Sequence, residues 1–159
     1  MKNKVKSHLQ LTNPWHLIAT GFGSGLFPVG LGTVGSLVAI LFWLLLILLP
    51  WQFYFLFVIF SISIGIYLCQ RTAKDTQIHD DSRIVWDEFV GIWITFIALP
   101  INNWQWVTIG FVIFRLFDIW KPWPICWCDR NLQGGLGIMI DDIIAGLFAA
   151  AIIYLFSQY

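Results

Sequence analysis

Five carboxylic acids lie inside apolar stretches of the sequence. Two adjacent pairs, Asp87-Glu88 and Asp141-Asp142, lie near the start of apolar runs, and Asp118 lies near the end of another. A charged side chain within a membrane-spanning helix costs at least about 2.5 kcal/mol, so each of these acids is a functional candidate. Adjacent residues of a helix point about 100° apart, so one helix can supply two positions of a shared site. These acids predict an acidic site at one depth of a membrane protein.

Two basic residues accompany the acids. Arg115 and Asp118 are three residues apart and therefore share one face of a helix. One interpretation is a self-neutralising ion pair that lets both side chains enter the membrane. Lys121 continues the same stripe and would add a surplus positive charge, which suits a phosphate. Both interpretations stay open on the sequence alone.

Clustered carboxylates suit a hard divalent cation. Mg²⁺ prefers oxygen ligands in near-octahedral geometry, with water and substrate phosphate completing its shell. No cysteine or paired histidine accompanies the acids, which argues against zinc. We therefore predict a Mg²⁺ site whose ligands come from Asp87, Glu88, Asp118, Asp141 and Asp142. His79 could give a proton to a leaving group, although a solvated loop histidine explains it as well.

A glycine-rich stretch, residues 21–36, leads directly into the first long apolar run. Free backbone N–H groups at the entry to a helix can bind an anion, so Gly32, Thr33 and Ser36 are candidate phosphate contacts. Thr33 or Ser36 could also cap the helix. Glycines equally permit close packing or a re-entrant turn, and these alternatives remain.

The helices that must position these residues are indicated by composition and by apolar runs. The chain has 159 residues, of which 58% are apolar and 11% are charged, whereas a soluble domain has roughly 45–50% and about 25%. Apolar runs cover residues 34–49, 51–69, 84–99, 104–120 and 138–156. We predict one all-α membrane domain over residues 1–159, with about five spanning helices. The segment that begins at Asn13 is too short to span and is expected to be an interfacial or re-entrant helix.

The distribution of charge orients this bundle. Lys and Arg occur at the N-terminus, in the loops around residues 71–83 and 121–130, and at Arg115, whereas the short links around Pro50 and Pro100 carry no charge. By the positive-inside rule the charged segments and the N-terminus face the cytoplasm. The formal net charge is zero, so nothing indicates a nucleic-acid partner. The expected partners are membrane lipids.

At this point the motifs resemble one family. The chain is similar to phosphatidylglycerophosphatase A, in order along nearly its whole length, in the segments Asn13-Pro-Trp-His-Leu, Gly21-Phe-Gly-Ser-Gly, Gly32-Thr-Val-Gly-Ser-Leu, Ile84-Val-Trp-Asp-Glu-Phe, Phe114-Arg-Leu-Phe-Asp-Ile-Trp-Lys-Pro-Trp-Pro-Ile and Gly137-Ile-Met-Ile-Asp-Asp. The resemblance implies a Mg²⁺-dependent lipid phosphatase of the bacterial inner membrane. Its substrate would be phosphatidylglycerophosphate, cut at the cytoplasmic leaflet. The family usually has Pro-Gly-Thr where this chain has Leu31-Gly32-Thr33.

The resemblance and the residues together lead to a mechanistic hypothesis. One or two Mg²⁺ ions would bridge the terminal phosphate and activate a water, with Asp87, Glu88, Asp118 and Asp142 as the principal catalytic acids. Arg115 and Lys121 would stabilise charge on the phosphoryl oxygens. A covalent aspartyl-phosphate is the alternative route. The rival function is a small divalent-cation or proton-coupled transporter, since intramembrane charges suit that function too.

Overall fold

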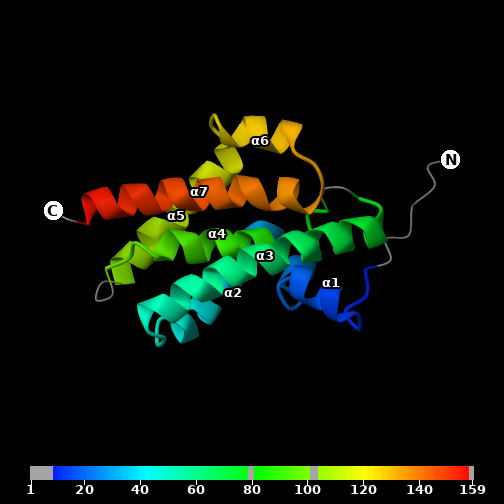
Figure 1. The fold of residues 1–159 in the computed structure, drawn as a ribbon, viewed down its shortest axis with the longest axis horizontal. Coiled ribbons are helices and arrows are strands. Elements are labelled where there is room, and N and C mark those ends of the chain that lie inside the picture. Colours follow the sequence, from blue (N-terminus) through cyan, green and yellow to red (C-terminus); the bar gives the residue numbers. More distant parts are fainter. Residues whose placement is uncertain (1–8, 79–80, 101–103, 158–159) are drawn as a thin grey trace.

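The structure, a computed structural model, describes residues 9–78, 81–100 and 104–157, and this part of the chain is helical without any strand. Its long helices run roughly along the long axis of the molecule (Figure 1). The all-helical class predicted from the sequence is confirmed. The elements are α1 (Pro14–Ala19), a 3-10 turn η1 (Ser24–Leu26), α2 (Leu31–Leu46), α3 (Trp51–Thr76), α4 (Trp86–Phe96), α5 (Trp104–Trp120), α6 (Ile125–Asn131) and α7 (Gly134–Phe156).

The central element is α4, which packs against α7, α2, α5 and α3. Nine of its 11 residues are buried, so neighbouring helices surround it on nearly all sides. It is shorter than the apolar run predicted over residues 84–99, because the helix ends at Phe96 and Ile97 to Leu99 form a turn before Pro100. A proline disfavours helical geometry at the residue before it, so helices usually end at or before that residue, as α4 does. At 1.5 Å per residue, α4 is about 16 Å long.

Among the described residues, two helices are long and apolar enough to cross a membrane, namely α3 with 26 residues and α7 with 23. They pack against each other as well as against α4 (Figure 1). Where they meet, a Cβ on Gly135 would collide with the carbonyl oxygen of Ile66, so only glycine allows this approach. Both helices exceed the predicted runs, since α3 continues past residue 69 to Thr76 and α7 begins at Gly134. A total of five spans stays a prediction.

The N-terminal segment is held against α3 by polar contacts. Asn13 caps α1 by accepting a hydrogen bond from the Trp15 N–H. His16 is buried, accepts from the Gln10 N–H at Nδ1 (3.1 Å) and contacts Asp75 Oδ2 through Nε2 (3.1 Å). Because Nδ1 is an acceptor, Nε2 carries the proton and donates to Asp75.

The glycines that follow α1 allow close packing. A Cβ on Gly25 would collide with the Arg83 carbonyl oxygen, and one on Gly35 would lie 2.8 Å from Val85 Cβ. The Val85 N–H also donates to the Ala19 carbonyl (2.9 Å). This part of the glycine-rich stretch therefore packs closely against the segment that leads into α4. Of the alternatives left open by the sequence, close packing describes it.

A short helix, α6, occupies a region where no helix was predicted. It follows Lys121, which has a left-handed backbone (φ 44°) and whose N–H closes α5 by donating to Phe117. Ile125 and Cys128 are buried, and α6 packs on α7 (Figure 1). Seven residues are too few for a stable isolated helix, so this element depends on tertiary contacts.

Candidate functional site

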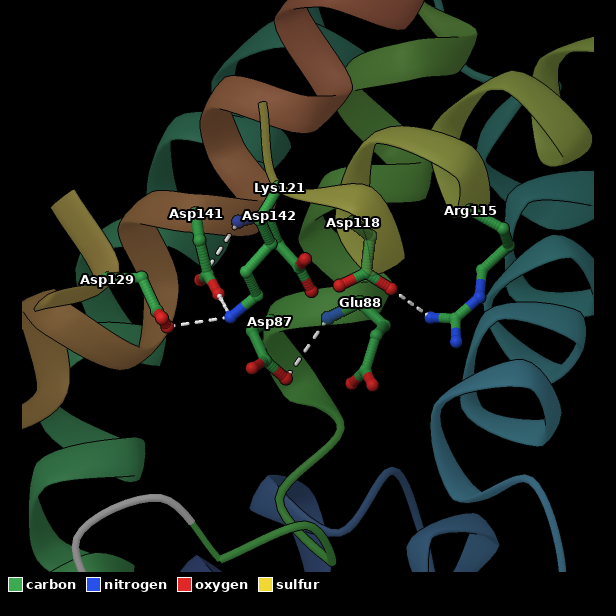
Figure 2. Close-up of polar contacts among 8 residues, drawn as sticks. All are labelled: Asp87, Glu88, Arg115, Asp118, Lys121, Asp129, Asp141 and Asp142. Atoms are coloured by element: carbon green, nitrogen blue, oxygen red, sulfur yellow. Dashed lines mark hydrogen bonds and ion pairs between the residues drawn. The ribbon is translucent and has the colours of Figure 1, made fainter. Parts of the chain in front are cut away.

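The site lies where the starts of α2 and α4, the end of α5 and the N-terminal half of α7 meet. All five predicted acids, together with Arg115 and Lys121, line a pocket of about 610 Å³. Figure 2 shows the acids of α4, α5 and α7 converging on one space, with Arg115 and Lys121 on opposite sides of it in this view. The complete lining is Pro28, Gly30, Leu31, Gly32, Ser82, Ile84, Asp87, Glu88, Arg115, Asp118, Ile119, Lys121, Asp141 and Asp142.

Three of the acids form a compact cluster. One carboxylate oxygen each from Asp87, Glu88 and Asp142 lies within 4.8 Å of the others. Glu88 Oε2 and Asp142 Oδ1 are buried and have no hydrogen-bond partner within the described part of the chain. A buried acceptor without a partner is costly, and two together call for a cation or ordered water. The oxygens of this cluster, which we call the carboxylate triad, fit the preference of a hard divalent cation.

Asp118 is paired with a cation. Arg115 Nη1 donates to Asp118 Oδ2 across one turn of α5, as their spacing predicts. The Nε atom of Arg115 is buried and has no partner among the described residues. The Arg115 guanidinium also reaches α2, where a Cβ on Gly32 would lie 3.0 Å from Nη1. Arg115 thus neutralises Asp118 and still has N–H donors for an anion.

Asp141 is paired in the same way. Its Oδ2 accepts from Lys121 Nζ at 2.7 Å, and its Oδ1 accepts from the Asp142 N–H at 3.0 Å. Lys121 Nζ also donates to Asp129 Oδ1 at 2.6 Å. Burial alone would lower the pKa of Lys121, but the hydrogen bonds from its ammonium to Asp129 and Asp141 outweigh this effect and raise the pKa. Lys121 is therefore firmly protonated, and both oxygens of Asp141 are engaged.

Asp129 was missed in the sequence analysis. It comes from α6, eight residues after Lys121, and the sequence contains no periodicity that relates the two. Only the packing of α6 on α7 brings Asp129 to Lys121 (Figure 2). The surplus positive charge expected at Lys121 is likewise balanced by two carboxylates.

The predicted phosphate contacts of the glycine-rich stretch lie in different places. Gly32 lines the pocket, whereas Thr33 is exposed and is not part of the lining. Ser36 is buried, and its hydroxyl donates to the Gly32 carbonyl at 2.8 Å. The cap of α2 is Gly30, with a left-handed backbone, rather than Thr33 or Ser36. His79 lies outside the described residues.

The acid pairs differ in their position along their helices. Asp87 and Glu88 belong to the first turn of α4, where the free N–H groups and the helix dipole favour negative charge. Asp141 and Asp142 are the eighth and ninth residues of α7, because this helix begins at Gly134. The dipole effect falls off within the first turn, so it does not account for the second pair. Asp141 is instead stabilised by its ion pair with Lys121.

Comparison with known proteins agrees with the motifs. A family model described as phosphatidylglycerophosphatase A matches residues 17–157. A phosphatidylglycerophosphatase A of Escherichia coli is 60% identical over 99% of this chain and 92% of its own length. The Haemophilus influenzae protein of the same name is 45% identical over 96% of this chain and 94% of its own length.

A third relative carries a different name. A putative phosphatidylinositol-3-phosphatase of Bacteroides thetaiotaomicron is 41% identical over 86% of this chain and 89% of its own length. No solved structure matches the chain significantly. The pocket of acids and cations is built from segments that lie within the matched residues, and the match covers nearly the whole fold. The chain belongs to the phosphatidylglycerophosphatase A family.

Proposed function

We propose that this protein is a lipid phosphatase that removes the terminal phosphate of phosphatidylglycerophosphate, giving phosphatidylglycerol and inorganic phosphate. Its relatives at 60% and 45% identity carry the corresponding name. The observation that carries the proposal is the pocket in which the carboxylate triad stands beside Arg115 and Lys121. Hydrolysis of a phosphate monoester by water is assisted by a cation that binds the phosphate oxygens and by a group that activates the water.

The charge of the pocket supports a divalent cation. Five carboxylates against two basic side chains leave three negative charges when all are ionised. A phosphate monoester brings a charge of about −1.5 to −2 at pH 7, so the acids of the pocket by themselves would repel it. The residues fit a metal, since two buried triad oxygens have no hydrogen-bond partner in residues 9–78, 81–100 and 104–157. We therefore propose that Asp87, Glu88 and Asp142 hold Mg²⁺, which when bound would polarise the phosphate and lower the pKa of a water.

The remaining residues would bind and orient the substrate. Arg115 offers N–H donors beyond the one given to Asp118, and these suit phosphoryl oxygens. The first turn of α2, at Leu31 and Gly32, adds free backbone N–H groups at the pocket. Asp118 lies outside the triad and is oriented by Arg115, so we assign it to accept the proton of the attacking water.

The same arrangement supports a membrane setting. The described Lys and Arg residues lie near the pocket end of α3, α4 and α5, or on α6. We propose a multi-pass protein of the bacterial inner membrane with about five spans, whose N-terminus and pocket face the cytoplasm. Exposed Trp120, Trp123 and Trp127 near this end suit the interface between lipid and water. The lipid tails would stay in the leaflet while the head group reaches the acids.

The transporter alternative has no support. A transport path needs polar groups that continue from the pocket toward the opposite end of the bundle. In the described part of α4, the polar residue beyond Glu88 is Thr95, and its hydroxyl donates to the Gly91 carbonyl of its own helix (2.8 Å). The relatives also carry phosphatase names.

The deciding experiment measures phosphate release by the purified protein in detergent. We expect release from phosphatidylglycerophosphate with Mg²⁺ and none with chelator. Phosphatidylinositol 3-phosphate should be assayed in parallel, because a 41% identical relative carries that name. Absence of Mg²⁺-dependent release from phosphatidylglycerophosphate would refute the proposal. Preferential release from the inositol lipid would transfer it to another substrate.

A further inference from the structure

A residue outside the pocket lining contacts Lys121 as closely as the pocket acid does. Asp129 Oδ1 lies 2.6 Å from Lys121 Nζ, against 2.7 Å for Asp141 Oδ2. Asp129 comes from α6, does not line the pocket and belongs to neither the carboxylate triad nor the Arg115–Asp118 pair. Its partner Lys121 does line the pocket. Asp129 therefore reaches the site through Lys121.

The backbone at Lys121 fixes where the side chain starts but not where its ammonium lies. Lys121 has a left-handed φ of 44°, and its N–H is bonded to the Phe117 carbonyl. A non-glycine residue in this conformation persists only where its surroundings determine it, and Pro122 prevents α5 from continuing. The start of the side chain is fixed in this way, while four rotatable bonds leave its end free.

The two carboxylates that fix this free end belong to one packed unit. Buried Ile125 and Cys128 anchor α6 on α7, and α7 carries Asp141. An ammonium has three N–H donors, of which two are used by Asp129 and Asp141. The third N–H has no hydrogen-bond partner among the described residues, and Lys121 lines the pocket.

We infer that Asp129 is a positioning residue that holds the Lys121 ammonium at the pocket rim, with one N–H donor ready for a phosphate oxygen of the substrate. This inference rests on the proposed function, since it assigns Lys121 to phosphate binding. A purely electrostatic effect of Asp129 on substrate binding would have the opposite sign. Removing an acid near an anion site should improve anion binding, whereas removing a positioning group should weaken it.

The test is a double-mutant cycle with Asp129→Asn and Lys121→Met, assayed for KM and kcat on phosphatidylglycerophosphate with Mg²⁺. We expect Asp129→Asn to raise KM about tenfold with kcat little changed, as for lost binding that is equal in ground and transition states. Asp129→Glu should recover most of the loss. In the Lys121→Met background Asp129→Asn should have no further effect. Arg130→Gln, an exposed charge change on the same helix, is the matched control and should leave KM unchanged.

Two kinetic results would overturn the inference: an unchanged or lower KM for Asp129→Asn, or an equal loss in the presence and absence of Lys121. Thermal melting of the same four proteins separates this outcome from failure of the proposed function. We expect Asp129→Asn to lower the melting temperature by about 2 °C only when Lys121 is present. If the wild type released no phosphate, the proposed function would fail. The melting cycle would still decide whether Asp129 acts on Lys121, and additive melting shifts would reject it.

Discussion

Replacing Gly32 with alanine tests the geometry of the pocket without removing any of its charges. A Cβ at this position would collide with Glu88 Oε1 and would lie 3.0 and 3.2 Å from Nη1 and Nη2 of Arg115. Both neighbours are the free ends of long side chains, so they can move while the backbone stays in place. The substitution therefore displaces a triad carboxylate and a phosphate-binding guanidinium together.

The size of the effect follows from the displacement. Glu88 would have to shift by about 1 Å to regain an ordinary contact, and a misplacement of this size can cost about 10²-fold in rate. Folding should not suffer, because alanine is favoured over glycine within a helix by roughly 0.5–1 kcal/mol. We expect phosphate release by Gly32→Ala to fall about 10²-fold at an unchanged or higher melting temperature.

The matched control is Gly110→Ala in α5. Its Cβ would lie 3.0 Å from Ile153 Cδ1 and 3.1 Å from Phe96 Cε1, which are side-chain atoms away from the pocket. This variant has the same chemical change with milder crowding of side-chain ends, and it should retain activity. Full activity of folded Gly32→Ala would refute the assignment of Glu88 and Arg115 to the site. An equal loss in both variants would point to a general effect of packing.

Three further changes test other parts of the argument. Asp142→Asn should lower Mg²⁺-dependent phosphate release by at least about 10²-fold, because it removes a triad ligand; unchanged activity of the folded variant would exclude Asp142 as a ligand. Burial alone would raise the pKa of Asp81, but the hydrogen bonds from Arg83 outweigh it and lower this pKa. The Asp81–Arg83 contact therefore stabilises the fold at neutral pH, and this stabilisation is lost on acidification. Asp81→Asn should lower the free energy of unfolding by about 1–3 kcal/mol at pH 7 and by progressively less below about pH 4, so that the melting temperatures of the two proteins converge. A difference in melting temperature that does not change with pH would contradict this. Gly135→Ala should destabilise by about 1–3 kcal/mol, because its Cβ would collide with backbone of α3, and an unaltered melting temperature would show that α3 and α7 can separate there.

The sequence predicted the helices best where the apolar pattern was long and uninterrupted. The run at residues 104–120 coincides with α5, and the spacing of Arg115 and Asp118 correctly predicted that they face each other. The regions that were missed depend on contacts between helices. The short helix α6 forms against α7. The early start of α7 at Gly134 brings its first turn against α3, and only glycine at position 135 permits this contact.

The acids of the site show the same division. The sequence by itself determined how many acids there are and how deep they lie in the apolar runs, because residue types and helical periodicity are local properties. It also determined the family of the protein. Which acids are free and which are paired was decided by the tertiary structure. Asp87, Glu88 and Asp142 come together from α4 and α7, whereas Asp141 is engaged by Lys121 and, through it, linked to Asp129. Such pairings depend on how far each helix slides and turns against its neighbours, and periodicity along one chain segment carries no information about that.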